Sequence, residues 1–194
     1  LEVVDALIEG LLEAGVPASN IVVWDRFEHH LISCLYEISR SEGGVRCYGG
    51  ESDGAVDLDP DVFYASELGD GEPSYLYRVA TRDVTKIINV PVPKDHNCSG
   101  VTGCLKNIAF GAVNNTVRFH GAPHYCDPMI GEICALPALR DKVVLHVMDA
   151  LRALCDGGPT VGNPERIFEP RELWLATDPV AADTVALDMI NAER

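Results

Sequence analysis

The sequence predicts an α/β protein in which a mostly parallel sheet is covered by helices on both faces. Short apolar runs alternate along the chain with amphipathic helical patterns, which is the order of repeated strand–helix units. The 194 residues are 47% hydrophobic and 23% charged, which is ordinary for a globular protein. This length allows one domain with a well-formed core. We therefore expect a single domain over residues 1–194, built as a Rossmann-like three-layer sandwich.

The first elements alternate as this fold requires. Apolar side chains recur at helical spacing over residues 2–14, and Gly15 follows as a helix stop. A short apolar run then predicts a buried strand that ends at Asp25. The next predicted elements are a helix over 30–41 and a strand over 45–48.

Residues 49–75 form an acidic excursion, rich in Gly, Asp, Pro and Glu, for which we expect little regular structure. Regular patterns return after it and alternate again. The apolar runs predict strands over 86–90, 142–148 and 172–176. The helical patterns lie around 105–109, over 128–135 and from Asp178, with Val180, Thr184, Leu187 and Ile190 on one face of the last helix.

Polar side chains follow four of the predicted strands. They are Asp25, the run Lys94 to His96, Asp149 and Asp178. In a parallel sheet, ligands bind outside the carboxyl ends of the strands. These groups are therefore expected along one edge of the sheet, although Asp178 is also a typical helix N-cap.

The stretch from Lys94 to Gly111, KDHNCSGVTGCLKNIAFG, has the features of an anion site. A glycine-bearing loop between a strand and a helix exposes backbone N–H groups, and a helix N-terminus adds positive potential. Lysines supply point charges for a carboxylate or a phosphate. Neither nucleotide-binding glycine fingerprint is present. The predicted ligand-binding residues are Lys94, Gly100, Thr102, Gly103, Asn107 and Gly111, and the predicted catalytic residues are His96, Lys106 and Asp149.

Histidine and cysteine also gather in this part of the chain, and both ligate transition metals. One possible set of metal ligands is His96, His120, Asp149 and Asp178. An alternative is an iron–sulfur cluster held by Cys98, Cys104, Cys126 and Cys134, although their spacing matches no standard pattern. Buried or incidental side chains are the competing explanation for most of them. A divalent metal or such a cluster is the cofactor that these residues would suit.

Composition restricts the class of function. With 30 acidic and 15 basic residues the net charge is −15, which argues against binding to nucleic acid. No apolar run is long enough for a membrane span. The seven cysteines include no C-x-x-C pair and form an odd set, so we expect reduced thiols in a cytoplasmic protein. The chain begins inside a helical pattern without Met, so a lost N-terminal signal remains open.

Several segments together resemble domain-of-unknown-function family 362. They are LIEGLLEAGVPASNIVVWDR, INVPVPKDHNCSGVTGCLKNIAFGAVNN, RFHG, LPALRDKVVLHVMDAL and LATDPVAADTVALDMI. The resemblance implies an upstream strand that this chain lacks, and an iron–sulfur association that is often attributed to the family. The positions that match its motif segments are Lys94, His96, Gly100, Thr102, Gly103, Lys106, Asn107, Gly111, His120, Asp149, Asp178 and Asp183.

These observations favour a domain that binds an anionic small molecule at the lysine- and glycine-bearing loop, with metal-assisted catalysis as one form of it. One alternative is a metal or iron–sulfur redox protein that works with a ferredoxin-like partner. The other is a non-catalytic interaction domain that uses residues 49–75. The sequence leaves the substrate, the reaction and the oligomeric state open.

Overall fold

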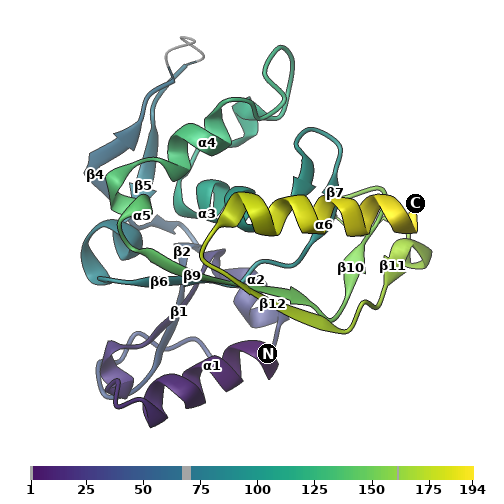
Figure 1. Cartoon of the computed structure of the whole chain (residues 1–194). Helices are drawn as coiled ribbons and strands as arrows, with labels where there is room; N and C mark the ends of the chain where they lie inside the picture. Colours follow the sequence, from purple (N-terminus) through teal and green to yellow (C-terminus); the bar gives the residue numbers. More distant parts are fainter. Residues whose placement is uncertain (1, 67–70, 161) are drawn as a thin grey trace.

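Helices and strands alternate along the chain in the computed structural model, which describes residues 2–66, 71–160 and 162–194 (Figure 1). The α-helices are α1 (Glu2–Glu13), α2 (Glu28–Ser33), α3 (Cys104–Ala112), α4 (Met129–Cys134), α5 (Pro137–Arg140) and α6 (Pro179–Glu193). The strands are β1 (Val22–Phe27), β2 (Arg46–Ser52), β3 (Ala55–Val56), β4 (Leu58–Tyr64), β5 (Ser74–Tyr77), β6 (Ile87–Asn89), β7 (Lys94–His96), β8 (Gly100–Thr102), β9 (Val143–Ala150), β10 (Ala153–Leu154), β11 (Ile167–Phe168) and β12 (Glu172–Ala176). The predicted α/β class is confirmed.

The strands do not form one mostly parallel sheet in the described residues. They pair in four small sheets, with the orders β1-β2-β3, β12-β9-β6, β11-β10-β7-β8 and β4-β5. The pairs β1–β2, β6–β9 and β7–β10 are parallel, and the other pairs are antiparallel. The Rossmann-like sandwich is therefore replaced by a mixed arrangement, because tight hairpins and the antiparallel return of β12 along β9 interrupt the parallel order.

The acidic excursion 49–75 is more regular than expected. It contains the second half of β2, then β3, β4 and the start of β5, and β4 and β5 pair as an antiparallel arm (Figure 1). Its acidic residues have local partners: Arg82 donates to both carboxylate oxygens of the buried Asp59 at 2.7 Å. The part of this prediction that falls on residues 67–70 lies outside the described residues.

One predicted helix is shorter than expected, and the face of the last helix that carries Val180 is largely exposed. The helix expected over 30–41 is α2, which ends at Ser33, because Leu35 has a left-handed backbone (φ 66°) that a helix cannot continue through. In α6 the buried residues are Ala182, Asp183, Ala186 and Ile190, whereas Val180 is 60% exposed. Small alanine side chains let α6 approach its neighbours closely, and this decides which face is buried.

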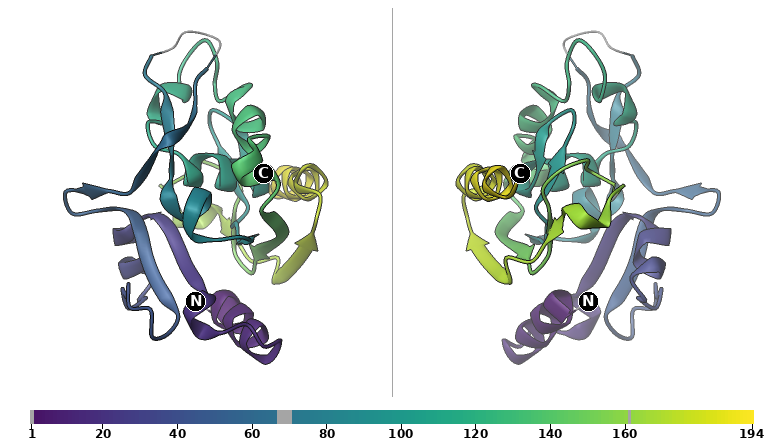
Figure 2. Two further views of the ribbon diagram at one scale, coloured as in Figure 1. Left: turned by 90° about the vertical axis from the view of Figure 1, so that its left-hand side faces the viewer. Right: turned by 90° about the vertical axis from the view of Figure 1, so that its right-hand side faces the viewer.

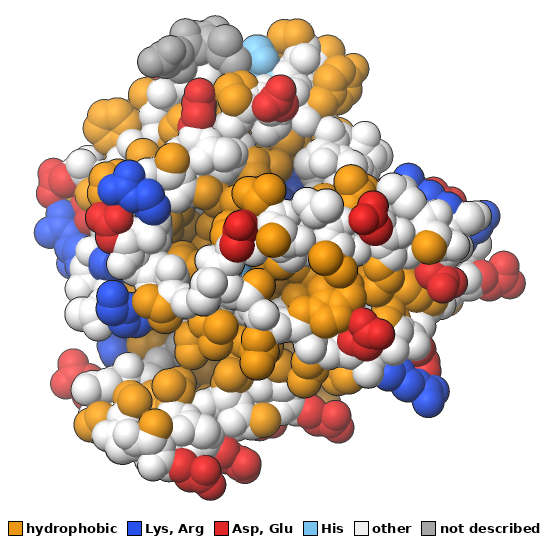
Figure 3. Space-filling model, in the orientation of Figure 1, with side chains coloured by type: hydrophobic (Ala, Val, Ile, Leu, Met, Phe, Trp, Pro, Cys, Tyr) orange, Lys and Arg blue, Asp and Glu red, His pale blue; other side chains and the backbone are white. Residues whose placement is uncertain are grey.

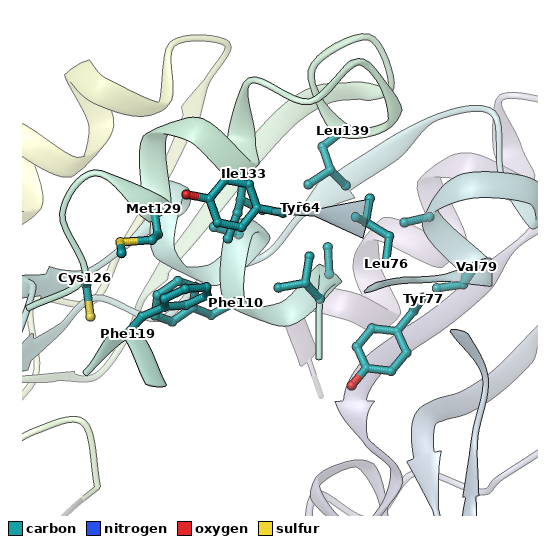
Figure 4. Close-up of a cluster of buried hydrophobic side chains, with 14 of the residues drawn as sticks. Tyr64, Leu76, Tyr77, Val79, Phe110, Phe119, Cys126, Met129, Ile133 and Leu139 are labelled. Carbon is teal, nitrogen blue, oxygen red and sulfur yellow. The ribbon is translucent and has the colours of Figure 1, made fainter. Parts of the chain in front are cut away.

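Two clusters of buried side chains meet at α3. The larger includes Phe110, Phe119, Met129 and Ile133, drawn in Figure 4. The smaller joins Cys104, at the start of α3, to Met148, Ala182 and Ala186. In Figure 2, α3 lies between the β1–β2 sheet on one side of the molecule and α6 on the other. Within the described ranges, none of the helices is long and apolar enough to cross a membrane.

Candidate functional site

The β7–β8 hairpin gathers three of the predicted site residues on one of its faces. Lys94 pairs with Thr102 and His96 pairs with Gly100 across the hairpin, so the side chains of Lys94, His96 and Thr102 share a face. Gly100 has a φ of +78°, a conformation that glycine adopts without steric cost and that closes the turn. Asp95 points to the opposite face, where its carboxylate accepts from Gly158 N and pairs with Arg194.

His96 is buried, and one of its ring nitrogens has no partner. Its Nδ1 accepts hydrogen bonds from the backbone N–H groups of Cys98 (3.0 Å) and Ser99 (3.2 Å). Because Nδ1 is an acceptor, the proton of the neutral ring lies on Nε2. That Nε2 atom is buried and has no hydrogen-bond partner among the described residues. Burial, followed by the charges of Lys106 and His120, lowers the pKa of His96 to about 4, so the ring is neutral at pH 7.

Thr102 is the second buried residue of this face with an unsatisfied polar atom. Its side chain is 6% exposed, and Oγ1 has no hydrogen-bond partner in the described part of the chain. Buried hydroxyls are usually hydrogen-bonded, because an unpaired one costs about 1–3 kcal/mol. Two such atoms on one hairpin face therefore indicate a position for water or a ligand.

Two half-buried lysines lie beside these atoms. Burial lowers the pKa of both Lys94 and Lys106, in the case of Lys106 to about 8, and each lysine acts electrostatically on His96. Lys106 projects from α3 with Nζ 4.8 Å from the centroid of the Phe110 ring, a cation–π contact. Neither lysine has a salt bridge or a hydrogen bond among the described residues. The charge of the Asp25 carboxylate raises the pKa of Lys94, against the larger effect of burial.

His120 lies next to His96 with their ring centroids 5.4 Å apart. Its Nδ1 donates to Thr116 O at 3.0 Å, which leaves Nε2 as an acceptor in the neutral ring. Burial is the largest cause that lowers its pKa. The structure thus brings Lys94, His96, Lys106 and His120 into one electrostatically coupled group.

A surface cavity of about 330 Å³ lies beside this group and was not predicted from the sequence. It is lined by Cys98, Ser99, Tyr125, Cys126, Asp127, Pro128, Ile130 and Gly131. Cys98, which lines the cavity, donates its N–H to His96 Nδ1 and its thiol to His120 O, which places the cavity next to the two histidines. Tyr125 and Cys126 have left-handed backbones, with φ of 46° and 73°. That conformation is uncommon outside glycine and had no sequence signal.

The N-terminus of α3 already has an anionic partner. Both oxygens of the Asp183 carboxylate, from α6, accept hydrogen bonds there: Oδ1 from Cys104 N and Oδ2 from Leu105 N, the latter at 3.0 Å. A Cβ on Gly103 would overlap Asp183 Oδ1, so this glycine leaves room for the carboxylate. The helix-terminal amides that were expected to bind a ligand are occupied by Asp183.

The other predicted residues have structural partners. Asn107 donates to Asn89 Oδ1 at 2.7 Å, and Asn89 in turn bonds Cys104 O and His146 Nδ1. Asp149 Oδ1 accepts from Leu151 N, and Asp178 Oδ1 accepts from Val180 N and Ala181 N as the N-cap of α6. Gly111 has open space around its Cα.

The metal-ligand sets predicted from the sequence are not assembled. Among residues 2–66, 71–160 and 162–194, no group of three His, Cys, Asp or Glu side chains is placed to hold a metal ion. Cys134 donates to Leu105 O and Cys98 to His120 O. Burial raises the pKa of Cys104 strongly and that of Cys134 to about 12, which opposes thiolate formation. In the described residues these thiols are not grouped as the ligands of a cluster, and the iron–sulfur cluster stays a prediction.

Comparison with known proteins gives a family but no function. Neither the search of curated proteins nor that of solved structures gave a match for this chain. The model of the family described as "Domain of unknown function (DUF362)" matches residues 1–188. Because the match covers nearly the whole chain, from α1 into α6, the protein belongs to the DUF362 family.

Proposed function

We propose that this protein binds a small anion, a carboxylate or a phosphate, between Lys94, His96, Thr102 and Lys106. We call these four residues the anion cradle. The observation that carries the proposal is the pair of buried, unpartnered polar atoms, His96 Nε2 and Thr102 Oγ1, on the same hairpin face as Lys94. Each is a donor that water or a ligand must satisfy.

The chemistry of the cradle selects an anion over a cation or a neutral ligand. Two ammonium groups and an Nε2–H offer only donors, and the Thr102 hydroxyl can donate as well. Hydrogen bonds between such donors and a charged oxygen are about twice as strong as neutral ones. The cradle holds four donors and no acidic residue, which is unusual in a chain with a net charge of −15. The cradle is therefore a local site for negative charge in an acidic protein.

Lys106 is the residue of the cradle that exchanges a proton in this proposal. Because its pKa is about 8, this amine is present in both its protonated and its neutral form near neutral pH. His96 holds its proton on Nε2 and acts as a hydrogen-bond donor, since its Nδ1 is already bonded to two amides. Asp149, the third predicted catalytic residue, bonds the backbone of its own turn and has no role in this proposal.

Calorimetric titration tests the proposal. Phosphate, acetate and lactate are titrated into the wild-type protein, Lys94→Met and Lys86→Met, the last being a matched change at an exposed lysine. At least one anion should bind the wild type and Lys86→Met equally. It should bind Lys94→Met about tenfold to a hundredfold more weakly, since a charge-assisted hydrogen bond contributes about 1.5–3 kcal/mol. Equal affinity for the two lysine variants, or no binding of any anion to the wild type, would refute the cradle.

Metal-assisted catalysis, a bound cluster and a redox partner stay predictions. They are tested by metal analysis and a visible spectrum of anaerobically purified protein. Stoichiometric iron with broad absorbance near ~400 nm would support the cluster.

A further inference from the structure

Two of the four lysines in this chain, Lys106 and Lys142, are partly buried but differ in their partners. Lys142 Nζ donates to three backbone carbonyls, those of Ala80, Thr81 and Val84, at 2.7–3.0 Å. Lys106 Nζ has no acceptor among the described residues and faces the Phe110 ring instead. Burial lowers the pKa of both lysines, but Lys142 has three carbonyl acceptors for its ammonium, whereas Lys106 has only the face of the Phe110 ring.

The surroundings of Lys106 favour a neutral amine. Desolvation is the largest cause that lowers the pKa of Lys106, and the positive charge of Lys94 adds to it, while the thiols of Cys126 and Cys98 act in the opposite direction. A lysine in a desolvated pocket beside a second cation is the arrangement that activates this side chain as a nucleophile. With a pKa of about 8, roughly one molecule in ten carries the neutral amine at pH 7.

We propose that Lys106 forms an imine with a short oxo acid whose carboxylate is held by Lys94. This inference rests on the proposed anion cradle and names the class of its ligand: a carboxylate with a carbonyl group a few bonds away. Lys94 shares the hairpin face with His96. Lys106 lies over the Phe110 ring, which packs against His120 next to His96, so both amines border the same pair of histidine rings. The cavity lined by Cys98, Tyr125 and Cys126 gives the carbonyl substituent a place near His96, whose Nδ1 accepts from Cys98 N.

The step is a condensation and needs no further reactant. The lone pair of the Lys106 amine attacks the carbonyl carbon, which forms the C–N bond and moves the C=O π electrons to oxygen. Proton transfer from nitrogen to oxygen gives a carbinolamine. The oxygen takes a second proton and leaves as water while the C=N bond forms. Thr102 Oγ1 and His96 Nε2, which have no protein partners, are the donors available to that oxygen.

Reductive trapping tests the imine. Wild-type protein is incubated with pyruvate and sodium borohydride, and the adduct is located by peptide mass spectrometry among the four lysines and the N-terminal amine. The expected product is a single adduct at Lys106, with the mass of pyruvic acid less one water plus two hydrogens. Its rate of formation should rise with pH through about 8, the pKa of Lys106. An adduct spread over the exposed Lys86 and the N-terminus, or none at all, would overturn the proposal.

Matched variants separate this inference from the anion cradle. Lys106→Arg keeps the positive charge but has no primary amine, so it should give no adduct, whereas Lys86→Arg, at an exposed lysine outside the cradle, should be trapped like the wild type. Lys94→Met should slow trapping of pyruvate about tenfold or more, and should slow trapping of acetaldehyde, which lacks a carboxylate, much less. If lactate or phosphate binds and pyruvate is not trapped, the imine is wrong and the cradle stands. If no anion binds and nothing is trapped, both fail.

Discussion

Thr102 and Thr116 are both buried threonines near α3, but only Thr116 has a hydrogen-bond partner. Thr116 Oγ1 accepts from Arg26 Nη1 at 2.8 Å, whereas Thr102 Oγ1 has no partner in the described residues. Replacing an unpaired buried hydroxyl by a methyl group removes a desolvation cost, and replacing a paired one leaves its partner unsatisfied. The two positions therefore test whether the hairpin face is built for a ligand.

We expect the free energy of unfolding of Thr102→Val to equal that of the wild type or to exceed it by up to about 1 kcal/mol. This variant should bind the anion more weakly. Thr116→Val should lose about 1–2 kcal/mol, because Arg26 would keep no acceptor at this position. Urea unfolding and calorimetry measure both effects. If Thr102→Val loses as much stability as Thr116→Val, Oγ1 has a structural partner and the case for the cradle weakens.

The pH dependence of stability follows from His96. Burial holds its pKa at about 4 in the folded protein, below the ordinary 6.5. As the pH falls from about 7 to about 4, the unfolded chain binds a proton that the folded chain does not, so stability is lost over that range. His96 alone can account for up to about 3 kcal/mol of it. In unfolding measurements at pH 7 and pH 5, His96→Asn should lose less stability between the two than the wild type.

His120 and His146 also have lowered pKa values, so the stability of His96→Asn should still fall with decreasing pH, but with a smaller slope than that of the wild type. A saturating anion should reduce the slope in the wild type, because negative charge beside His96 raises its pKa. A slope that is identical in the wild type and His96→Asn would contradict the buried, neutral ring.

Two glycines, one just before α3 and one in its last turn, differ in how closely other atoms approach them. Gly103 lies against the Asp183 carboxylate that caps the helix, and Gly111 has nothing within 4 Å of an added Cβ. We expect Gly103→Ala to cost about 2 kcal/mol or more, since it displaces the cap and strains the helix start. Gly111→Ala should be neutral or stabilise by up to about 1 kcal/mol, because alanine is the better helix former. Thermal unfolding measures both.

A double-mutant cycle identifies the cause. If Gly103 serves to admit Asp183, the costs of Gly103→Ala and Asp183→Ala should not add, because the first change already removes the contact that the second deletes. Anion affinity should fall in both, since α3 carries Lys106. Additive costs would mean that Gly103 is required for its backbone alone.

The sequence predicted where most elements lie but not how they pair. The apolar runs located the strands at Val22, Ile87, Val143 and Glu172, and the cap at Asp178 was confirmed. Periodicity reports which residues avoid water and carries no information on a strand's partner. The β7–β8 hairpin was missed for this reason. The motif around it was found because glycines and lysines are unusual in such a segment.

The residues of the proposed cradle were named from the sequence but their surroundings were not, and that they bind a ligand stays a prediction. Lys94, His96, Thr102 and Lys106 were all named from the sequence, and the structure brings their side chains together. The role of Asp183 could not be foreseen, because it depends on α6 packing on α3, two elements far apart in the chain. The cavity wall at Tyr125 depends on left-handed backbone at two non-glycine residues. Such contacts are long-range and leave no local pattern.

Hydrophobic side chains remain exposed along β12 and α6, where Leu175 is 72% exposed (Figure 3). The small sheets nevertheless share one central helix. α3 contributes Phe110 to the larger buried cluster and Cys104 to the smaller one. An element that belongs to both clusters couples their stabilities, so the chain should unfold as one unit and not as separate parts.

The two tryptophans report on the two clusters separately. Trp24 packs against the larger cluster and Trp174 against the smaller one. With Trp174→Phe or Trp24→Phe in place, fluorescence follows one cluster at a time during urea unfolding. When Met148→Ala is added, we expect the urea midpoints of the Trp24 signal and the Trp174 signal to fall by the same amount. That change opens a cavity in the smaller cluster and should cost about 2–4 kcal/mol. If only the Trp174 signal moves, the clusters unfold independently, and α3 does not make one domain of residues 1–194.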